Sequence, residues 1–360
     1  MDHKAFSRRI DRLRLAMARE QLDAFLIHDR NNTAYFSGFK GTSSIIVISE
    51  SAALFFTDFR YIQQAGEEMR GFDVRLMTQG GATELAAALK QLKPHCIGFE
   101  GAINYTQYLQ FKCAAARAKM VESGTMPATL RSVKEPWEIE IMAANQRLNE
   151  RIFQWATRSL KPGMTERRLQ KGIRIRMLDA GCEESFDTIA ASGANSAHPH
   201  AHVTARRIRK ADLLMIDMGV KRDGYNSDLT RTVAVECASP RARAIFDIVL
   251  EAQERALAAV RPGAVCRDVD AVARSFIASA GYGEFFGHGL GHGVGLDIHE
   301  YPRLNPRSTV VLEEGMTITI EPGIYIPGFG GVRIEDLVVV IGDGYRNLTK
   351  TGKRLRFVGR

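Results

Sequence analysis

The sequence predicts two domains, a smaller α/β domain followed by a larger α+β domain built from an internal repeat. Three observations lead to this prediction. A chain of 360 residues exceeds the usual size of a single domain. Prolines interrupt the pattern of helices and strands between residues 127 and 137, and we expect domains at residues 1–130 and 135–360. A Pro-Gly motif and a strand-borne carboxylate each recur about 100 residues apart in the second domain.

The first domain alternates helix-like and strand-like stretches. Residues Ser7 to Glu20 have helical periodicity, and short apolar runs typical of buried strands follow. These runs are Phe25–Ile27, Ser44–Ile48, Ala53–Phe56 and Cys96–Phe99. The alternation favours an α/β domain.

The internal repeat of the second domain is seen in Leu160–Met164, which matches Val260–Ala264 at an offset of 100. Each motif lies between two helical stretches, and Asp217 and Glu321 follow on apolar strands at an offset of 104. Two halves of the form helix, helix, hairpin would face each other around a pseudo-twofold axis. Their carboxylates would then meet at the centre.

The first carboxylate hairpin is expected from the apolar run Ala211–Val220, the turn signal Arg222–Gly224 and the Thr-rich return Tyr225–Val235. A turn centred on Arg222 and Asp223 makes Asp217 and Asp228 opposite or diagonal neighbours, about 5 Å apart. Like charges this close on a half-buried sheet are destabilising unless one is protonated or a cation lies between them. A metal ion is the simplest solution.

A second carboxylate hairpin is expected from Gly315–Glu321 and Val332–Val340, joined by a glycine-rich turn. Pro322 cannot donate to a sheet ladder, so Glu321 should lie at the end of its strand. Glu321 and Glu335 are therefore placed to converge.

A glycine-rich segment, Phe286–Glu300, lies between the two hairpins. Five glycines in nine positions argue against a helix, so His288 and His292 are not a helical zinc motif. The spacing also lacks the dinucleotide pattern G-x-G-x-x-G. In an extended chain the two histidines share one face, and the glycines allow the backbone to approach a ligand closely.

Together these blocks resemble the pita-bread metallopeptidases, which include Xaa-Pro aminopeptidases, Xaa-Pro dipeptidases (prolidases) and methionine aminopeptidases. The resemblance covers nearly the whole chain, and the spacing of the blocks is that of the proline-specific branch. It implies a creatinase-like α/β N-terminal domain and a pita-bread α+β catalytic domain. The segments that carry it are His198–His200, Ile216–Gly219, Ser227–Thr232, His288–His299, Glu321–Gly323 and Arg333–Asp336.

The resemblance assigns roles to individual residues. Five positions match the metal ligands of the family: Asp217, Asp228, His292, Glu321 and Glu335. His200 and His299 match catalytic histidines near the scissile bond, and Glu321 doubles as a proton shuttle. Four further positions match residues that line or support the substrate site: His288, Arg303, Tyr325 and Arg333.

Four carboxylates and one imidazole suit Mn²⁺, Co²⁺ or Zn²⁺, and the resemblance implies two divalent ions per subunit, with Mn²⁺ as the first choice. The activity implied is hydrolysis of the bond between an N-terminal residue and a penultimate proline by a hydroxide bound to both metals. Because this bond is a tertiary amide with no N–H, ordinary protease sites do not grip it. A prolidase that cleaves only dipeptides is the alternative, and a non-catalytic binding protein on the same fold is disfavoured by the intact ligand set.

The composition, with 45% hydrophobic and 25% charged residues, is that of a soluble globular protein. We expect a cytoplasmic protein, since no apolar run suits a membrane span or a signal peptide. The five widely spaced cysteines predict buried thiols without disulfides. The net charge of +8 and the basic run Arg206–Lys210 accompany no nucleic-acid module, so no nucleic-acid partner is expected. The resemblance implies a peptide substrate with proline at the second position. The resemblance also implies a homodimer.

Overall fold

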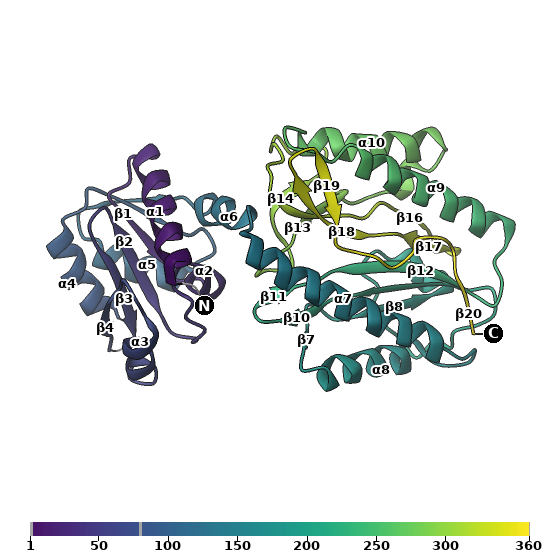
Figure 1. Cartoon of the computed structure of the whole chain (residues 1–360), viewed down its shortest axis with the longest axis horizontal. Coiled ribbons are helices and arrows are strands. Elements are labelled where there is room, and N and C mark those ends of the chain that lie inside the picture. Colours follow the sequence, from purple (N-terminus) through teal and green to yellow (C-terminus); the bar gives the residue numbers. More distant parts are fainter. Residues whose placement is uncertain (1–2, 79–80, 360) are drawn as a thin grey trace. The chain divides into compact units, whose positions relative to one another are not determined.

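The computed structural model describes residues 3–78 and 81–359, which form two compact units that divide between Arg131 and Ser132. The first unit contains one sheet with the strand order β4-β3-β2-β1-β5-β6, flanked by helices (Figure 1). Its elements are α1 (His3–Arg19), β1 (Ala24–Ile27), α2 (Arg30–Ser37), β2 (Ile45–Ser49), β3 (Ala53–Thr57), α3 (Ile62–Glu68), β4 (Asp73–Leu76), α4 (Ala82–Leu92), β5 (Cys96–Phe99), α5 (Tyr105–Ala114), β6 (Lys119–Glu122) and α6 (Thr125–Ser132).

The sheet of the first unit is mixed. Strands β1 and β2 are antiparallel and wholly buried, whereas β1 pairs with β5, and β5 with β6, in parallel. The four central strands are those expected from apolar runs. The edge strands β4 and β6 are half-exposed and carry charged residues, so their sequences lack the apolar signal that marks a buried strand.

The second unit holds paired strands between two pairs of helices (Figure 1). Its first half comprises α7 (Pro136–Ser159), α8 (Glu166–Asp179), β7 (Glu183–Glu184), β8 (Ile189–Ser192), η1 (Gly193–Ala197), β9 (Leu213–Met218), β10 (Val220–Arg222), β11 (Tyr225–Asn226) and β12 (Leu229–Val235). The rest comprises α9 (Pro240–Ala258), α10 (Cys266–Ser279), η2 (Gly283–Phe285), β13 (Gly291–Gly293), β14 (Glu300–Leu304), β15 (Thr317–Ile320), β16 (Gly323–Ile326), β17 (Gly330–Arg333), β18 (Asp336–Ile341), β19 (Gly344–Asn347) and β20 (Phe357–Val358).

The two halves of this unit repeat one plan. Helices α7 and α9 both begin with proline, which fits the first turn because no backbone N–H is required there. Helices α8 and α10 are each 14 residues long, and Gly163 and Gly263 precede them with φ of 85° and 82°. Each helix pair packs on the apolar face of its own sheet. The expected repeat of helix, helix and hairpin is therefore present.

The first hairpin differs in register from one sequence-based expectation. Asp217 faces Thr230 across β9 and β12, and Lys221 faces Asn226 in the same register. The turn falls on Asp223 and Gly224, whose φ values of 56° and 90° suit a tight hairpin turn. It lies one residue later than expected, so Asp217 and Asp228 are diagonal neighbours and are not directly opposite each other.

The second hairpin consists of two short ladders, β15 with β18 and β16 with β17, which share one register although an irregular step separates them. Thr317 faces Val339 across β15 and β18, and Gly323 faces Arg333 across β16 and β17. The residue numbers of facing pairs have the same sum in both ladders, and Glu321 and Glu335 share that sum. These two carboxylates therefore meet at the step between the ladders, with Glu321 just after β15 as expected.

The glycines of β13 allow its neighbours to approach closely. A Cβ on Gly291 would lie 2.0 Å from the carbonyl oxygen of Thr319, and one on Gly293 would lie 2.3 Å from that of Tyr301. The sequence suggested close approach to a ligand. The backbone instead approaches other strands at these two positions, and His292 between them is held tightly.

Two expectations drawn from composition have different outcomes. Cys182 and Cys266 are buried as expected, Cys96 and Cys237 are only partly buried, and Cys113 is exposed on α5, so the prediction of buried thiols is wrong for Cys113. Within residues 3–78 and 81–359, no helix combines the length and apolarity needed to cross a membrane.

We predict that Gly291→Ala destabilises the second unit, because the added methyl group would clash with backbone that cannot rotate away. The thermal midpoint should fall by roughly 5 °C or more, as measured by calorimetry. Gly287→Ala is the matched control, since nothing lies within 4 Å of its added Cβ. Equal midpoints for the two variants would contradict this account of β13.

Candidate metal centre

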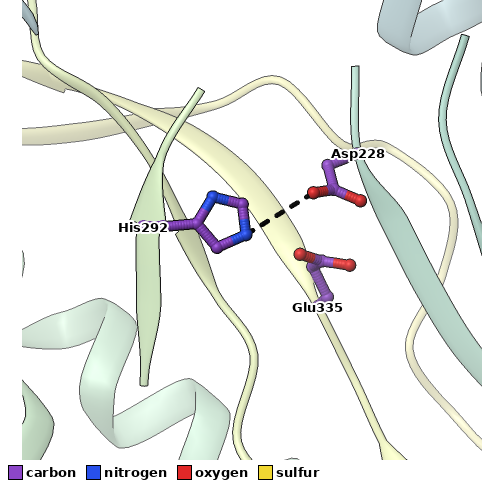
Figure 2. A group of neighbouring side chains, drawn as sticks. All are labelled: Asp228, His292 and Glu335. Carbon is purple, nitrogen blue, oxygen red and sulfur yellow. Dashed lines mark ion pairs between the residues drawn. The ribbon is translucent and has the colours of Figure 1, made fainter. Parts of the chain in front are cut away.

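Five potential ligands converge at the centre of the second unit. Asp217 lies on β9, Asp228 precedes β12, His292 lies on β13, and Glu321 and Glu335 flank the step of the second hairpin. Ligand atoms of Asp228, His292 and Glu335 all lie within 4.8 Å of one another (Figure 2). His292 Nε2 is 3.7 Å from Asp228 Oδ2 and 3.2 Å from Glu321 Oε1.

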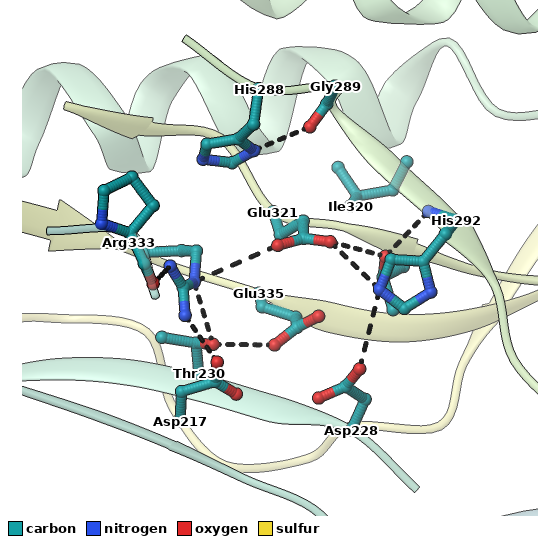
Figure 3. A network of polar contacts seen from close by, with 12 residues as sticks. Asp217, Asp228, Thr230, His288, Gly289, His292, Ile320, Glu321, Arg333 and Glu335 are labelled. Carbon is teal, nitrogen blue, oxygen red and sulfur yellow. Dashed lines mark hydrogen bonds and ion pairs between the residues drawn. The ribbon is translucent and has the colours of Figure 1, made fainter. Parts of the chain in front are cut away.

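Arg333 and Thr230 complete the polar network around these ligands (Figure 3). The Arg333 guanidinium donates to Asp217 Oδ2 and lies 3.9 Å from Glu321 Oε2. The Thr230 hydroxyl donates to Glu335 Oε2 at 2.8 Å. The other oxygen of Asp217, Oδ1, is buried and has no hydrogen-bond partner among the described residues. An acceptor in this position is suited to a cation.

The buried carboxylates repel one another. Burial, followed by the charges of neighbouring carboxylates, raises the pKa of Asp228 and Glu335 well above their usual values. Burial also raises the pKa of Asp217, although Arg333 opposes it. Glu321 differs: burial favours its neutral form, but the His292 hydrogen bond and charge outweigh this and lower its pKa to about 2. One arginine cannot balance four carboxylates.

These residues fit a divalent metal ion. Carboxylate oxygens with one imidazole are donors that divalent first-row ions accept, and a cation removes the repulsion that raises the carboxyl pKa values. Asp217, Asp228, His292, Glu321 and Glu335 are the residues that would hold the metal.

The orientation of His292 favours metal binding. Its Nδ1 lies 3.1 Å from the carbonyl oxygen of Gly293. Because a carbonyl only accepts, Nδ1 carries a proton, so a metal ion that displaces the proton on Nε2 would meet the Nε2 lone pair facing the carboxylates. The Thr319 hydroxyl accepts from the His292 backbone N–H at 3.0 Å and donates to Glu321 Oε1 at 3.1 Å.

A buried ion pair supports the ligands from behind. Arg231 donates to Asp336 Oδ1 at 2.7 Å, and also to the carbonyl oxygen of Glu335. Asp336 Oδ2 accepts from Lys353 at 2.8 Å and from Asn347 at 2.7 Å. Burial alone would raise the Asp336 pKa, but Arg231 and Lys353 lower it. The ionised pair ties β12 to β18, the strands that begin directly after Asp228 and Glu335.

The metal centre lies on the wall of a cavity of about 610 Å³. Of the eleven predicted site residues, Tyr325 does not line the cavity; the ten that do are Asp217, Asp228, His292, Glu321, Glu335, His200, His299, His288, Arg303 and Arg333. Tyr325 is buried behind this wall. Its hydroxyl accepts from Arg333 at 2.9 Å and lies 2.8 Å from His288 Nε2.

Two histidines of the cavity wall, His288 and His299, are held neutral. Burial lowers the pKa of His288, and its Nδ1 lies 2.8 Å from the Gly289 carbonyl oxygen. Nδ1 therefore carries the proton, and Nε2 accepts from Tyr325. Partial burial, with the neighbouring His292 and Arg303, lowers the pKa of His299 to about 4. The His299 ring packs edge-on against His292, with ring centroids 4.4 Å apart.

Sequence reasoning missed several residues of the wall, among them Gln170, Phe186, Asp187 and Asn305. It also missed Thr230, which donates to Glu335. Thr230 could have been found, because it lies two residues from Asp228 and therefore on the same face of the strand. Asp187 carried no such signal, because it lies outside every motif that predicted the site.

Comparison with known proteins identifies the family. Residues 140–341 match metallopeptidase family M24, and residues 9–133 match the creatinase/prolidase N-terminal domain. The chain is 38% identical over 350 residues to an Xaa-Pro dipeptidase of Pyrococcus furiosus, covering 96% of this chain and 99% of that protein. It also resembles the solved Xaa-Pro dipeptidase from Bacillus anthracis, with a TM-score of 0.95, 37% identity, and coverage of 98% and 100%.

A solved X-Pro aminopeptidase from Thermotoga maritima is similar at a TM-score of 0.87 and 36% identity, with 97% and 100% of the chains covered. The fold and the site thus define a metallopeptidase of the pita-bread type. The chain belongs to metallopeptidase family M24 and carries a creatinase/prolidase N-terminal domain. The resemblance found in the sequence is confirmed.

We predict that Asp228→Asn lowers metal content while leaving the metal-free protein as stable as the unmodified one, or more so. The substitution removes a metal ligand, but it also removes one of the mutually repelling buried charges. Metal analysis and thermal midpoints with and without Mn²⁺ measure both effects. His299→Ala is the comparison and should keep its metal. Normal metal content in Asp228→Asn would remove Asp228 from the ligand set.

We also predict that Asp336→Asn weakens metal binding about tenfold or more, because it releases the start of β18, which directly follows Glu335. Arg231 would lose a buried counterion, which costs about 3–5 kcal/mol. Metal titrations and thermal midpoints are the measurements. Glu251→Gln, which breaks an exposed ion pair with Arg255, should change the stability by less than about 1 kcal/mol. Unchanged metal affinity in Asp336→Asn would show that the pair does not support the ligands.

Proposed function

We propose that this protein is an Xaa-Pro dipeptidase that uses two divalent metal ions, with Mn²⁺ as the first choice, held by Asp217, Asp228, His292, Glu321 and Glu335. The observation that carries the proposal is the buried cluster of four carboxylates and one imidazole on the wall of a cavity of about 610 Å³. A cavity of this size accommodates a small peptide.

Arg303 supports the dipeptidase over the aminopeptidase that the sequence first suggested. Its side chain lines the cavity, is exposed, and makes no hydrogen bond or ion pair with other residues of the described ranges. In an Xaa-Pro dipeptide, the residue after the scissile bond ends in a carboxylate, which a guanidinium binds well. A longer peptide has an amide there. Relatives named Xaa-Pro dipeptidase point the same way.

An Xaa-Pro aminopeptidase remains the second candidate, because the Thermotoga maritima relative carries that name at 36% identity. The two activities share the chemistry of the metal centre and differ in what lies beyond proline. The choice between the two activities therefore depends on whether Arg303 binds the free C-terminal carboxylate of the substrate.

When bound, divalent ions would supply Lewis acidity. This polarises the scissile carbonyl and makes it easier for a water molecule to lose a proton as it attacks that carbonyl. The residues of the chain do the rest of the work. Glu321 presents its carboxylate on the cavity wall and can accept the proton of the attacking water. It can then deliver that proton to the proline nitrogen, which must be protonated to leave as a secondary amine.

His200 and His299 lie on the cavity wall and can donate N–H groups to the carbonyl oxygen as it gains negative charge. His299 is suited to this role because its low pKa keeps it neutral near pH 7. A neutral donor stabilises the oxygen without repelling nearby cations. His288, fixed by Tyr325 and the Gly289 carbonyl, forms a rigid part of the same wall.

The test is an assay of the metal-stripped protein, with and without Mn²⁺, on Ala-Pro, Ala-Pro-NH₂ and Ala-Pro-Ala, following release of alanine. We expect cleavage that depends on metal and strongly favours Ala-Pro. Arg303→Met should raise the KM for Ala-Pro by roughly 10- to 100-fold, the loss expected for a charge-assisted hydrogen bond, and should change Ala-Pro-NH₂ much less.

Arg307→Met is the matched control, because Arg307 is exposed nearby but does not line the cavity. Equal rates on Ala-Pro and Ala-Pro-Ala would favour the aminopeptidase. Absence of cleavage of all three peptides by metal-loaded protein would favour a binding protein.

A further inference from the structure

The positive charge of this chain is concentrated in two segments of the second unit. Residues 158–181, which include α8, and residues 204–210 together contain eleven lysines and arginines against two acidic residues. Their net charge of +9 exceeds the +8 of the whole chain, so the remaining residues are close to neutral as a group. None of these eleven cationic side chains lines the cavity of the metal centre. The excess charge therefore has no part in the site described above.

The fold brings the two basic segments together. The Glu166 backbone N–H, at the start of α8, donates to the Arg206 carbonyl oxygen at 3.1 Å. The Arg207 guanidinium donates to the Gly163 carbonyl oxygen at 2.9 Å. The basic run thus lies beside the N-terminal end of α8. We call the outward face of α8, together with residues 206–210, the basic surface.

The outward face of α8 combines cationic and apolar side chains. Leu169, Ile173 and Met177 are buried and attach the helix to the core of its half. The opposite face exposes Arg167, Arg168, Lys171, Arg174, Ile175 and Leu178, whose spacing puts them on one side of a helix.

These side chains are available to a partner. Ile175 is 46% exposed and Leu178 is 62% exposed, which leaves both apolar tips in water. Arg174 pairs with Glu184 at 3.0 Å at an exposed position, where such a pair contributes little. The side chains of Arg168 and Lys171 form no ion pair within the described ranges, and both are exposed.

The internal repeat shows that this composition is not a requirement of the fold. Helix α10 occupies the place of α8 in the other half and has the same length. Its charged residues are two arginines and two aspartates, so it is neutral. The positions equivalent to Ile175 and Leu178, at an offset of 100, hold Ser275 and Ala278. The same structural role is therefore filled without excess charge or exposed apolar side chains.

The basic run shows the same contrast between the halves. Ile208 and Leu312 are equivalent, because the N–H of each donates at 2.8 Å to the carbonyl that follows the glycine of its Pro-Gly motif. The next two residues are Arg209–Lys210 in the first half and Glu313–Glu314 in the second, and all four are exposed. One position in the fold is thus basic in one half and acidic in the other. The charge of the first half serves another purpose.

The chemistry of the basic surface fits the phosphates of a membrane better than those of a nucleic acid. Arginine and lysine pair with phosphate in either partner. A membrane also accepts apolar side chains at the boundary between headgroups and acyl chains, as it does for interfacial helices. On a nucleic acid, Ile175 and Leu178 would stay in water, and the basic surface has no aromatic side chain on which bases could stack.

We propose that the basic surface docks this protein on membranes that contain anionic phospholipids. The cationic side chains of α8 and of residues 206–210 pair with the lipid phosphates, and Ile175 and Leu178 enter the boundary beneath them. This contact is peripheral and needs no membrane-spanning helix. It is also independent of which peptide the metal centre cleaves.

The experiment is co-sedimentation of the Mn²⁺-loaded protein with vesicles of phosphatidylcholine, or of phosphatidylcholine and phosphatidylglycerol at about two to one. We expect binding to the anionic vesicles alone, and loss of that binding as NaCl is added. Replacing three charges together, with Arg167→Gln, Arg168→Gln and Lys171→Gln, should weaken binding on the order of 100-fold. The matched control is Arg261→Gln, Arg307→Gln and Lys350→Gln, which removes three exposed charges elsewhere in the second unit and should bind nearly as well.

A second variant tests the apolar part of the surface. Ile175→Ser with Leu178→Ala gives α8 the residues of α10 and should weaken vesicle binding roughly tenfold. Thermal midpoints and metal content establish that every variant is folded and loaded. Equal weakening by the two triple variants would reduce the effect to net charge and overturn the surface. Failure to bind anionic vesicles, with binding of a single-stranded oligonucleotide measured by fluorescence anisotropy, would replace the membrane with a nucleic acid.

Discussion

Repulsion among four buried carboxylates is the constraint on which the rest of this structure depends. Asp228 and Glu335 are almost fully buried, and burial together with neighbouring charges raises their pKa values. Such an arrangement opposes folding, since Arg333 contributes one positive charge against four negative ones. The cluster is stable only if the surrounding chain is rigid and a cation supplies the missing charge. Its position on a cavity wall gives such a cation access to substrate.

The rigidity comes from contacts between residues about 100 positions apart. The Glu335 backbone N–H donates to the Thr230 carbonyl at 3.1 Å, and the Arg333 N–H donates to the Thr232 hydroxyl at 3.1 Å. These bonds join the two hairpins side by side. Arg231, which donates to Asp336, adds a further link between the two hairpins. The residues next to the ligands in sequence are therefore the residues that hold the two halves together.

The sequence predicted the fold and the site well where a residue type was unusual for its surroundings and had one simple physical explanation. Carboxylates on apolar strands, a repeated Pro-Gly motif and a glycine-rich segment with two histidines predicted both the repeat and the set of residues that converge. Register was harder, because a turn displaced by one residue changes which side chains face each other, and Asp223 and Gly224 could not be distinguished from Arg222 and Asp223 as its centre. The role of Gly291 was also misjudged, since the approach of Thr319 depends on a strand 28 residues later in the chain.

The sequence did not show which exposed charged side chains line the cavity. Arg303 was assigned to the substrate site by resemblance alone and Asp187 was not assigned, and only the folded cavity brings them onto one wall. The metal centre contributes hydrolytic power but little selectivity, because any peptide carbonyl responds to a Lewis acid. Selectivity among substrates must then come from charged side chains of the cavity wall that form no ion pair with the residues of the metal centre. An unpaired guanidinium on the cavity wall, that of Arg303, complements a substrate that ends in a carboxylate next to the scissile bond, as the proposed Xaa-Pro dipeptide does.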